Sequence, residues 1–551
     1  MAPDELIELI RSSVIGTDVA IPTPYGLRRV TYADYTASGR SLGFIEDYIR
    51  DNVLPLYANT HTESSATGAQ TTTLREEARE EIRRATGAGD EHAVIFAGSG
   101  ATGAVDRLIQ IMGVRIPAGL DDRFDLRSHI PEHARPVVFV GPYEHHSNEL
   151  PWRESICDVV EIAEDSDGHI DLGDLERQLL QYGSRSVRIG SFSAASNVTG
   201  IVSDTGALSS LLHSHGALSF WDFAAAGPYL RIEMGSPATG LDYKDAIFLS
   251  PHKFIGGPST PGVLVVRKAL LSNRVPAVPG GGTVSYVNTE EHHYLADPEH
   301  REEGGTPAIV EAIRAGLVFR LKDEVGVDEI RKREESFVRR AIAYWGEVPE
   351  ISILGNPLAE RLSIVSFVIR YGDGHLHHNF VVAVLNDLFG IQSRGGCSCA
   401  GPYGHRLLGI DLDASHRFEE AVARGCELIK PGWARVNFNY FISEEEFEYI
   451  LKAVELIARR GWRLLPQYRY DAATARWVHR SGVPAPAQSL QDFNVGNPTA
   501  PPQLIAAEYE RYLAEAAAIM EQAAPVPADD AALDPEAEAL RWFPLPQEIA
   551  T

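Results

Sequence analysis

The chain has 551 residues, of which 44% are hydrophobic and 23% charged, and its formal net charge is −26. A chain of this length is expected to form two or three domains. The negative charge disfavours nucleic acid or an anionic membrane surface as the main partner, although backbone amides can still bind an anionic ligand locally. No apolar run is long enough to span a membrane, and residues 1–13 are acidic and amphipathic, unlike a signal or transit peptide.

Only four cysteines occur, which is too few for a disulfide framework and is typical of the reducing cytoplasm, where we expect the protein. Cys157 lies in a strand-like run and Cys426 in a helical one, so both are interpreted as inert core residues. Cys397 and Cys399 share a glycine-rich loop instead and need a separate explanation.

Short apolar runs rich in Val, Ile and Phe alternate with helical patterns through the first 300 residues. They comprise residues 92–98, 135–141, 186–193, 217–224, 245–250 and 262–268. This pattern predicts an α/β fold with buried strands in a mainly parallel, doubly wound sheet. In such sheets ligands gather at the carboxyl ends of the strands, so we examine the polar residues there.

The pattern changes near Pro307. A long helix is predicted over residues 309–345, followed by strand-like residues 351–355, 362–370 and 434–441 with helices between them, which indicates a smaller α+β domain. We therefore expect an N-terminal segment, a large domain, a small domain and a C-terminal extension, with limits at residues 1–30, 31–306, 307–463 and 464–551.

The extension begins with a hairpin-like stretch at residues 469–482 and continues through a Pro-rich stretch. An Ala-rich helix is predicted within residues 501–524, before an acidic tail. These residues are either packed on the protein or partly disordered, and their chemistry is not readable from the sequence.

Two charged residues follow predicted strands. Asp222 closes the run 217–224, and Lys253 follows the run 245–250 in the block Ser-Pro-His-Lys. A carboxylate at a strand end can pair with a cationic ring nitrogen and keep a pyridine ring protonated. Taken alone, Lys253 is more often a surface lysine that happens to follow a strand, and Asp222 can be a helix N-cap.

Residues 92–109 give a strand, a glycine-rich turn and a helix, an arrangement in which backbone amides and the helix dipole attract a phosphate. Such a turn can also hold a nucleotide, but its spacing matches neither G-x-x-x-x-G-K-[ST] nor a clean G-x-G-x-x-G. His145 and His146 follow another strand, where a ring can lie flat on an aromatic cofactor, although one such histidine is more often structural.

The order and spacing of these segments resemble the class V aminotransferase family of fold-type I pyridoxal 5'-phosphate (PLP) enzymes, and within it the cysteine desulfurases and selenocysteine lyases. The resemblance extends from Tyr32, in YADYTASGRSL, to Phe441 and leaves out the C-terminal extension. It implies PLP as the cofactor and a homodimer with its sites at the interface.

The resemblance implies that Lys253 holds PLP as a Schiff base and moves the proton at the substrate α-carbon, while Asp222 pairs with the ring nitrogen. It implies further that His145 stacks on the ring and that Asn197 approaches the ring hydroxyl. The cofactor-binding residues implied at the phosphate end are Gly100, Ala101, Thr102, Ser250 and His252, with Thr306 reaching the phosphate of the other subunit.

One departure from the family is Ala225. Cysteine desulfurases usually have a glutamine three residues after the aspartate, where it contacts the ring oxygen; here that position is Ala225. Asn197 or a water is then left to satisfy that oxygen. The departure makes the chain more similar to the branches that include molybdenum-cofactor sulfurases, where small residues occur at this position.

The loop that contains the two cysteines distinguishes among PLP reactions. Cys399, followed by Ala-Gly-Pro, stands where the family has its nucleophile, with Cys397 two residues earlier. A thiolate there can take sulfur from PLP-bound cysteine as a persulfide and leave alanine. The alternatives are that the two cysteines merely pack in a tight loop, or that they bind zinc, for which His405 is the one further ligand nearby; we expect no metal site.

Two arginines and a histidine complete the expected site. Arg435 matches the arginine that binds the substrate carboxylate in this family, because a guanidinium grips a carboxylate at two points. Arg394 lies in the cysteine loop and His61 in a segment where the family has a substrate-side loop.

We therefore predict a PLP enzyme that removes sulfur from L-cysteine to give L-alanine and an enzyme persulfide, which passes to an acceptor protein or metabolite. Selenocysteine lysis is a close variant. Transamination, epimerisation and β-elimination stay open as alternatives, as does an inactive sulfur carrier, against which the retention of Lys253, Asp222 and Arg435 argues.

Overall fold

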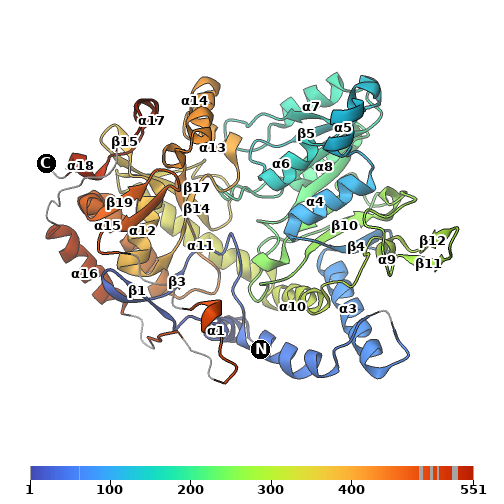
Figure 1. The fold of residues 1–551 in the computed structure, drawn as a ribbon, viewed down its shortest axis with the longest axis horizontal. Coiled ribbons are helices and arrows are strands. Elements are labelled where there is room, and N and C mark those ends of the chain that lie inside the picture. The colour runs from blue at the N-terminus through green and yellow to red at the C-terminus, as the bar shows by residue number, and fades with distance from the viewer. Residues whose placement is uncertain are drawn as a thin grey trace.

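The fold was analysed in a computed structural model, which describes residues 2–60, 62–482, 488–496, 501–504, 508–523 and 532–549. Figure 1 shows two parts, each built around a sheet, lying side by side. The larger part holds a seven-stranded sheet in the order β4-β10-β9-β8-β7-β5-β6. Its strands, in chain order, are His92–Ala97, Val137–Val140, Asp158–Glu161, Arg188–Ser193, Leu218–Asp222, Ala246–Leu249 and Gly262–Arg267 (β4 to β10).

The expected α/β fold with a mainly parallel large sheet is confirmed. Strands β5 to β9 pair in parallel, and β10 alone runs antiparallel to both of its neighbours. The sequence pattern did not indicate that reversal. Its cause is the short connection over residues 250–261, because parallel neighbours require a longer crossover than this segment supplies.

Both faces of the large sheet are buried, which explains why its strands are apolar without alternation. In β4, Val94 and Phe96 join one hydrophobic core, whereas Ala93 and Ile95 join another on the opposite face. The helices of this part are α3 to α10, with bounds Ala66–Ala85, Gly100–Ile111, Ala118–Phe124, His146–Arg153, Leu172–Gln181, Thr205–Ser214, Pro298–Arg301 and Ile309–Val325. Helix α4 packs on β9 and β10, and α10 packs along α3.

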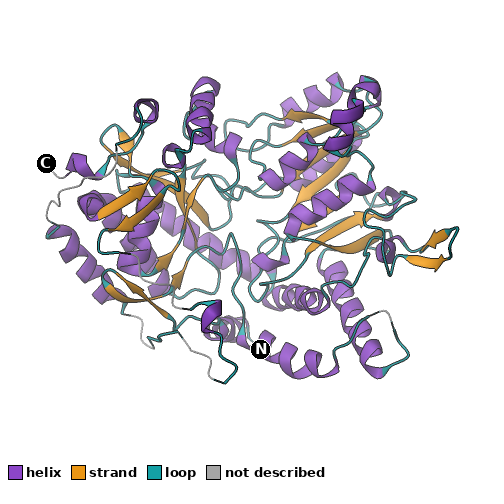
Figure 2. Ribbon diagram, in the orientation of Figure 1, coloured by secondary structure: helices purple, strands orange, loops and turns teal. Residues whose placement is uncertain are grey.

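The smaller part is an antiparallel sheet in the order β13-β14-β18-β17, with β15 added on β14. Figure 2 shows strands of this part among its helices. Its strands are Ile351–Ile353, Ile364–Tyr371, Gly374–His375, Arg394–Gly396 and Trp433–Asn437 (β13, β14, β15, β17 and β18). Its helices α11 to α15 are Val327–Gly346, His378–Phe389, Gly401–Leu407, Leu412–Ala423 and Glu444–Arg460. The expected domain limits stay predictions.

One predicted helix is two helices. The stretch 309–345 is divided into α10 and α11 at Gly326, whose φ is +85°. A residue with a side chain rarely adopts that backbone conformation, so the glycine ends the first helix and lets the chain turn into the second. The apolar pattern continues through the break because both helices face buried cores.

The ends of the chain pack on this framework. Helix α1 (Pro3–Ser13) buries Ile7 and Ile10, and the two-residue strand β3 (Thr31–Tyr32) pairs in parallel with β16 (Ile391–Gln392). The remaining strands outside the two large sheets form ribbons: β1 and β2 at Ala20–Thr23 and Gly26–Arg29, and β11 and β12 at Val284–Val287 and His292–Tyr294.

The predicted hairpin at residues 469–482 is present as β19 (Tyr468–Asp471) and β20 (Arg476–His479). The predicted Ala-rich helix is shorter than expected: α16 covers Tyr509–Glu521, and its buried residues join the core of the smaller part. Two short helices, α17 (Pro535–Leu540) and α18 (Pro546–Ile549), follow. Within the described part of the chain, no helix is both long enough and apolar enough to cross a membrane.

Candidate active site

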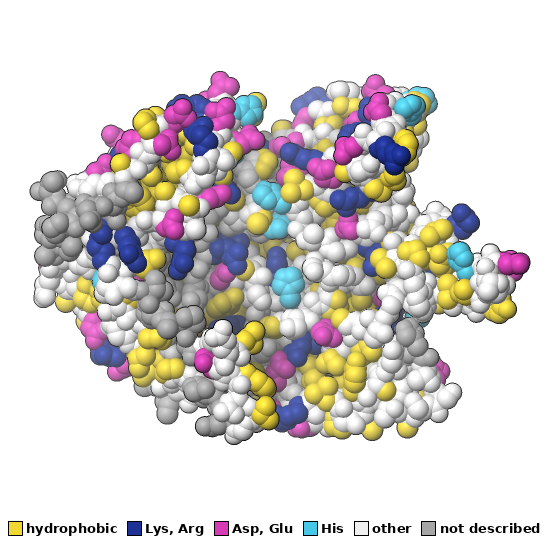
Figure 3. Space-filling model, viewed as in Figure 1, with side chains coloured by type: hydrophobic (Ala, Val, Ile, Leu, Met, Phe, Trp, Pro, Cys, Tyr) yellow, Lys and Arg dark blue, Asp and Glu magenta, His cyan; other side chains and the backbone are white. Residues whose placement is uncertain are grey.

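A cavity of about 240 Å³ lies between the two parts, where the ends of the large-sheet strands face β17 and β18. In Figure 3 histidine and basic side chains gather along this hollow. The expected site residues that line it are Gly100, Ala101, Thr102, His145, Asn197, Asp222, Ser250, His252, Lys253, Arg394, Cys399 and Arg435. A larger cleft of about 860 Å³ between α1, α15 and α16 holds none of the expected residues.

Lys253 and Asp222 come from neighbouring strands. Asp222 is the last residue of β8, and Lys253 ends a short turn after β9. Burial lowers the pKa of Lys253 to about 8; Asp222 opposes this shift, and Arg435 adds to it. Burial likewise raises the pKa of Asp222, against the hydrogen bond from the Ala224 amide and the charge of Lys253. Lys253 and this hydrogen bond do not fully offset the effect of burial on Asp222, so a further cation beside the carboxylate would stabilise its charged form.

The turn before α4 forms a cradle at the start of a helix. Gly100 has φ +56°, and a Cβ there would lie 2.9 Å from both Ser250 Oγ and His252 Cε1. The Ala101 amide donates to Ser250 Oγ at 2.8 Å, and the Thr102 hydroxyl lines the same cavity. Backbone amides at a helix start favour an anion, so this end of the cavity suits a phosphate.

The two histidines of the cavity are neutral rings. Burial, with a smaller contribution from the charge of Lys253, lowers the pKa of His145 to about 3 and that of His252 to about 4. His145 caps α6, and its Nδ1 accepts from the Ser147 amide at 3.1 Å. A neutral ring held in this way can stack on an aromatic ring without adding charge.

Glu144 supports His145 and was missed by the sequence reasoning, although it directly precedes that histidine. Its carboxylate is buried and accepts from the Ser193 amide at 2.9 Å and from the Asn148 amide group at 2.7 Å. Burial raises the pKa of Glu144 to about 7, and these hydrogen bonds oppose that shift. It joins the end of β5 to β7 and so fixes the turn that carries His145.

Arg435 and Arg394 lie on adjacent strands and share one carboxylate. Arg435 Nη2 lies 3.0 Å from Asp34 Oδ1, and Arg394 Nε lies 3.0 Å from Asp34 Oδ2. Arg435 Nη1 also donates to the backbone oxygen of Asn197 at 2.9 Å. Sequence reasoning missed Asp34, whose signal was its place in YADYTASGRSL.

The cysteine loop reaches the cavity through Cys399. Ser398 and Cys399 have φ +51° and +56°, a conformation that residues with side chains rarely adopt. The loop is held by the His146 amide, which donates to the Cys399 oxygen at 2.9 Å, and by Asn197 Nδ2, which donates to the Ser398 oxygen at 2.8 Å. Cys399 is exposed at the cavity, whereas Cys397 is half-buried and packs against the core.

Some expected residues are not brought to the cavity. Thr306 is exposed outside it and accepts from Asn59 Nδ2 at 3.3 Å, and His61 lies outside the described residues. Cys157 and Cys426 are buried, but Cys426 follows the end of α14 and does not lie within a helix. Ala225 lines the cavity with a methyl group in place of the family's amide.

The model of the family "Aminotransferase class-V" matches residues 31–448. The chain belongs to that family. It is 27% identical over 421 residues to a protein of Halalkalibacterium halodurans named "Probable cysteine desulfurase", an alignment covering 74% of this chain and 95% of the relative. Enzymes of this family use PLP, and the expected family resemblance is confirmed.

Solved structures agree with the expected fold-type I architecture. The apo cysteine desulfurase of Thermococcus onnurineus NA1 matches with a TM-score of 0.63 and 25% identity, covering 78% of this chain and 95% of that one. The cysteine desulfurase CsdA of Escherichia coli, in its S-sulfonic acid form, matches with a TM-score of 0.61 and 19% identity, covering 83% and 98%. At that identity the second likeness shows the fold alone.

Proposed function

We propose that this protein is a PLP-dependent enzyme that removes sulfur from L-cysteine, giving L-alanine and a persulfide on Cys399. The observation that carries the proposal is a single cavity lined by Lys253, Asp222, Arg435 and the exposed thiol of Cys399. The desulfurase names of the relatives support it. A transaminase has no need of the thiol.

The residues present fit PLP. Around the cavity, Thr36 Oγ1, Ser398 Oγ and Arg435 Nε are buried and have no hydrogen-bond partner among the described residues. Buried polar atoms of this kind are normally satisfied, so a polar ligand is expected there. Lys253 supplies an amine with a lowered pKa, and Asp222 supplies a carboxylate for the ring nitrogen.

Each end of the cofactor has its own residues. The Gly100 turn, Ser250 and His252 would hold the phosphate, His145 would cover the ring, and Asn197 would approach the ring hydroxyl. When bound, PLP serves as an electron sink for charge that develops at the substrate α-carbon. These assignments follow the family motif position by position.

The chain's own side chains account for the rest of the reaction. Arg435 and Arg394 grip the substrate carboxylate and so fix the α-carbon, and Lys253 moves its proton. Cys399 bonds to the substrate sulfur, the Cβ–S bond breaks with its electron pair left on carbon, and protonation of that carbon completes alanine.

The test supplies L-cysteine to the PLP-loaded protein and measures alanine and sulfide with and without dithiothreitol. Mass spectrometry after one turnover is expected to find the extra sulfur on Cys399. Cys399→Ala should keep PLP and bind cysteine without forming a persulfide. Cys397→Ser should reduce the lifetime of the persulfide, or its delivery, more than it reduces the first formation of the persulfide. Extra sulfur on Cys397 alone would reverse the assignment of the nucleophile. The absence of both persulfide and alanine would reject the proposed function.

We also propose a homodimer with sites at the interface. Thr306 is exposed away from its own cavity, as a residue that serves the partner's phosphate would be. Large apolar side chains are also exposed, among them Leu54, Leu56, Tyr57, Tyr286 and Val287. Sedimentation should give twice the chain mass, and mixing Thr306→Ala with Lys253→Ala chains should restore a fraction of intact sites. A monomer at micromolar concentration would contradict this.

Location in the cytoplasm and a sulfur acceptor belong to the same proposal. The thiols of Cys397 and Cys399 lie free near the surface and need a reducing compartment to stay reactive. An acceptor protein or metabolite would then take the sulfur from the exposed Cys399. Labelled cysteine incubated with cell extract, followed by isolation of labelled products, identifies it.

A further inference from the structure

Asp34 lies between the two arginines of the candidate substrate site. Its carboxylate oxygens are each 3.0 Å from a guanidinium nitrogen, one from Arg394 and one from Arg435. The Asp34 side chain is 12% exposed and that of Arg435 is 4% exposed. Both arginines line the cavity, whereas Asp34 stands behind them and does not.

The two guanidinium groups keep donors for a second carboxylate. Arg435 uses Nη1 on the Asn197 oxygen and Nη2 on Asp34, while its Nε is buried with no partner among the described residues. Arg394 meets Asp34 through Nε, so its terminal nitrogens are not used by that contact, and its half-exposed side chain lines the cavity. Asp34 therefore orients the pair without using up its donors.

The charges of Arg394, Arg435 and Asp34 do not cancel. Two guanidinium cations and one carboxylate leave a single net positive charge at the place where a substrate carboxylate would bind. Burial lowers the pKa of Arg435, and the charge of Asp34 opposes that shift, so the carboxylate helps to keep a buried guanidinium charged. A buried site of this kind binds best the ligand that neutralises it.

We propose that Asp34 is a specificity-determining residue, which limits the arginine pair to one carboxylate and so selects monocarboxylic amino acids over dicarboxylic ones. The inference rests on the proposed function for the identity of the site, and it narrows the substrate class to amino acids with an uncharged side chain, such as cysteine. Without Asp34 the pair carries two net positive charges, and a second carboxylate on the ligand gains a favourable partner.

The experiment measures ligand binding and needs no sulfur removal. PLP-loaded protein is titrated with L-alanine and with L-aspartate, followed by the absorbance of the bound cofactor and by calorimetry. In Asp34→Asn, the ratio of the two dissociation constants should move toward L-aspartate by about tenfold or more, because a nearby unit charge acts through a low effective dielectric constant. Thermal unfolding of each variant checks that it is folded.

A charge-restoring variant separates specificity from mere positioning. Asp34→Asn combined with Arg394→Gln again leaves one net positive charge, so the ratio should return toward that of the original protein. Glu46→Gln, which removes a carboxylate from the Arg314 ion pair outside the cavity, should leave the ratio unchanged.

Three results would overturn the proposal. They are an equal change in both affinities in Asp34→Asn, a double variant that resembles the single one, and an original protein that binds L-aspartate as tightly as L-alanine. Calorimetry measures the ratio of the two dissociation constants even when no PLP absorbance develops. A failure of the cofactor proposal can therefore be distinguished from a failure of the specificity proposal. If PLP binds but no alanine forms from cysteine, the desulfurase proposal alone fails.

Discussion

At the scale of single residues, the site depends on burial more than on hydrogen bonding. Burial and two neighbouring arginines outweigh the attraction of Asp222 and lower the pKa of Lys253 to about 8, so more of its amine is neutral near physiological pH than in an ordinary lysine. A neutral amine is the form that reacts with an aldehyde. The same burial keeps His145 and His252 uncharged, so the positive charge of the cavity is carried by Lys253 and the arginines.

The pKa of Lys253 gives a pH prediction. Covalent attachment of PLP to the apoprotein, trapped with borohydride, should rise with pH and have its midpoint near pH 8, well below the range of an ordinary lysine. In Arg435→Gln the rise should move to higher pH, because one of the cations that lowers this pKa is gone. Lys253→Ala should trap no cofactor. Trapping at the original stoichiometry in that variant would show that another lysine is used.

Asp222 has a separable role. Asp222→Asn should still bind PLP but slow turnover by roughly a thousandfold, about 4 kcal/mol, because a neutral amide does not keep a ring nitrogen protonated. The comparison is turnover with L-cysteine at equal cofactor occupancy, measured by absorbance. Turnover close to that of the original protein would exclude the pairing of Asp222 with the ring.

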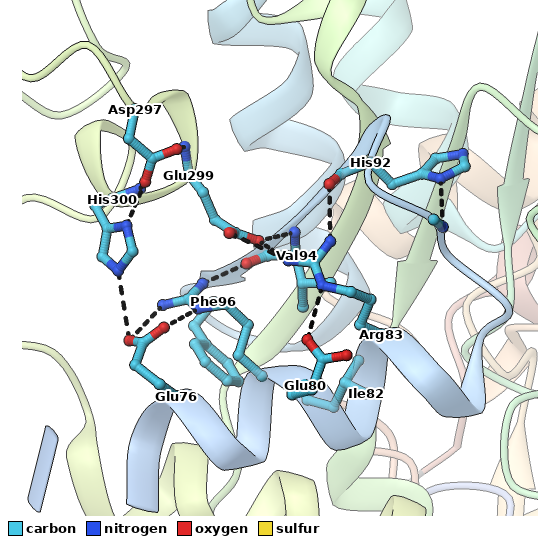
Figure 4. A network of polar contacts seen from close by, with 12 residues as sticks. Glu76, Glu80, Ile82, Arg83, His92, Val94, Phe96, Asp297, Glu299 and His300 are labelled. Carbon is cyan, nitrogen blue, oxygen red and sulfur yellow. Dashed lines mark hydrogen bonds and ion pairs between the residues drawn. The ribbon is translucent and has the colours of Figure 1, made fainter. Parts of the chain in front are cut away.

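At the scale of elements, the free edge of the large sheet is closed by side chains rather than by another strand. Glu299 accepts from the Val94 amide of β4, and Arg83 donates to the His92 oxygen (Figure 4). Glu303 accepts from the Phe96 amide at 2.7 Å. Charged groups thus pair backbone groups on the side of β4 that has no neighbouring strand, which protects this edge from pairing with other chains. They also fix the segment that leads to Thr306.

Glu303 gives the prediction for this edge. Burial would raise the pKa of Glu303, but Arg79 and Arg75 outweigh it and lower the value to about 2. The stability that ionised Glu303 contributes is therefore fully present above the ordinary range of carboxyl pKa values and is lost as the pH falls toward 2. Glu303→Gln should reduce the free energy of unfolding by about 3 kcal/mol, because it leaves two buried guanidinium groups without their shared carboxylate.

The matched control is Glu80→Gln. Glu80 pairs with Arg83 on the same helix, but its side chain is 71% exposed, so its loss should cost less than about 1 kcal/mol. Urea unfolding at pH 7 and at pH 3 measures both variants. A similar loss for the two substitutions would show that burial of the Glu303 network is not what stabilises this edge.

At the scale of the whole molecule, the last described segment of the chain packs behind β17, the strand that carries Arg394. The Trp542 ring stacks on His377 and His378, at 5.4 and 5.7 Å between centroids, and its Nε1 donates to the Ile429 oxygen at 2.9 Å. His378 in turn lies under β17, since a Cβ at Gly395 would come within 3.2 Å of its ring. The described part of the extension is thus packed against the strand that carries Arg394.

Trp542 tests that packing. Trp542→Ala should lower the free energy of unfolding by about 2 kcal/mol through lost stacking and burial of a half-buried ring. Leu358→Ala is the control, because that side chain is 92% exposed and its loss should change stability by less than about 0.5 kcal/mol. Urea unfolding compares the two. An unchanged free energy of unfolding in Trp542→Ala would mean that the contacts of this ring do not stabilise the protein.

The sequence by itself determined the strands of the large sheet, the position of Lys253 and Asp222 at strand ends, and the place of Cys399 in its loop. These follow from local causes, namely apolar periodicity and turn-forming residues. The tertiary structure alone decided the reversed direction of β10, the contact of Glu303 with β4, and the pairing of Asp34 with Arg394 and Arg435, 360 and 401 residues away. A charged side chain reveals its partner only when the chain topology has brought the two together, because nothing in the neighbouring residues encodes so distant a contact.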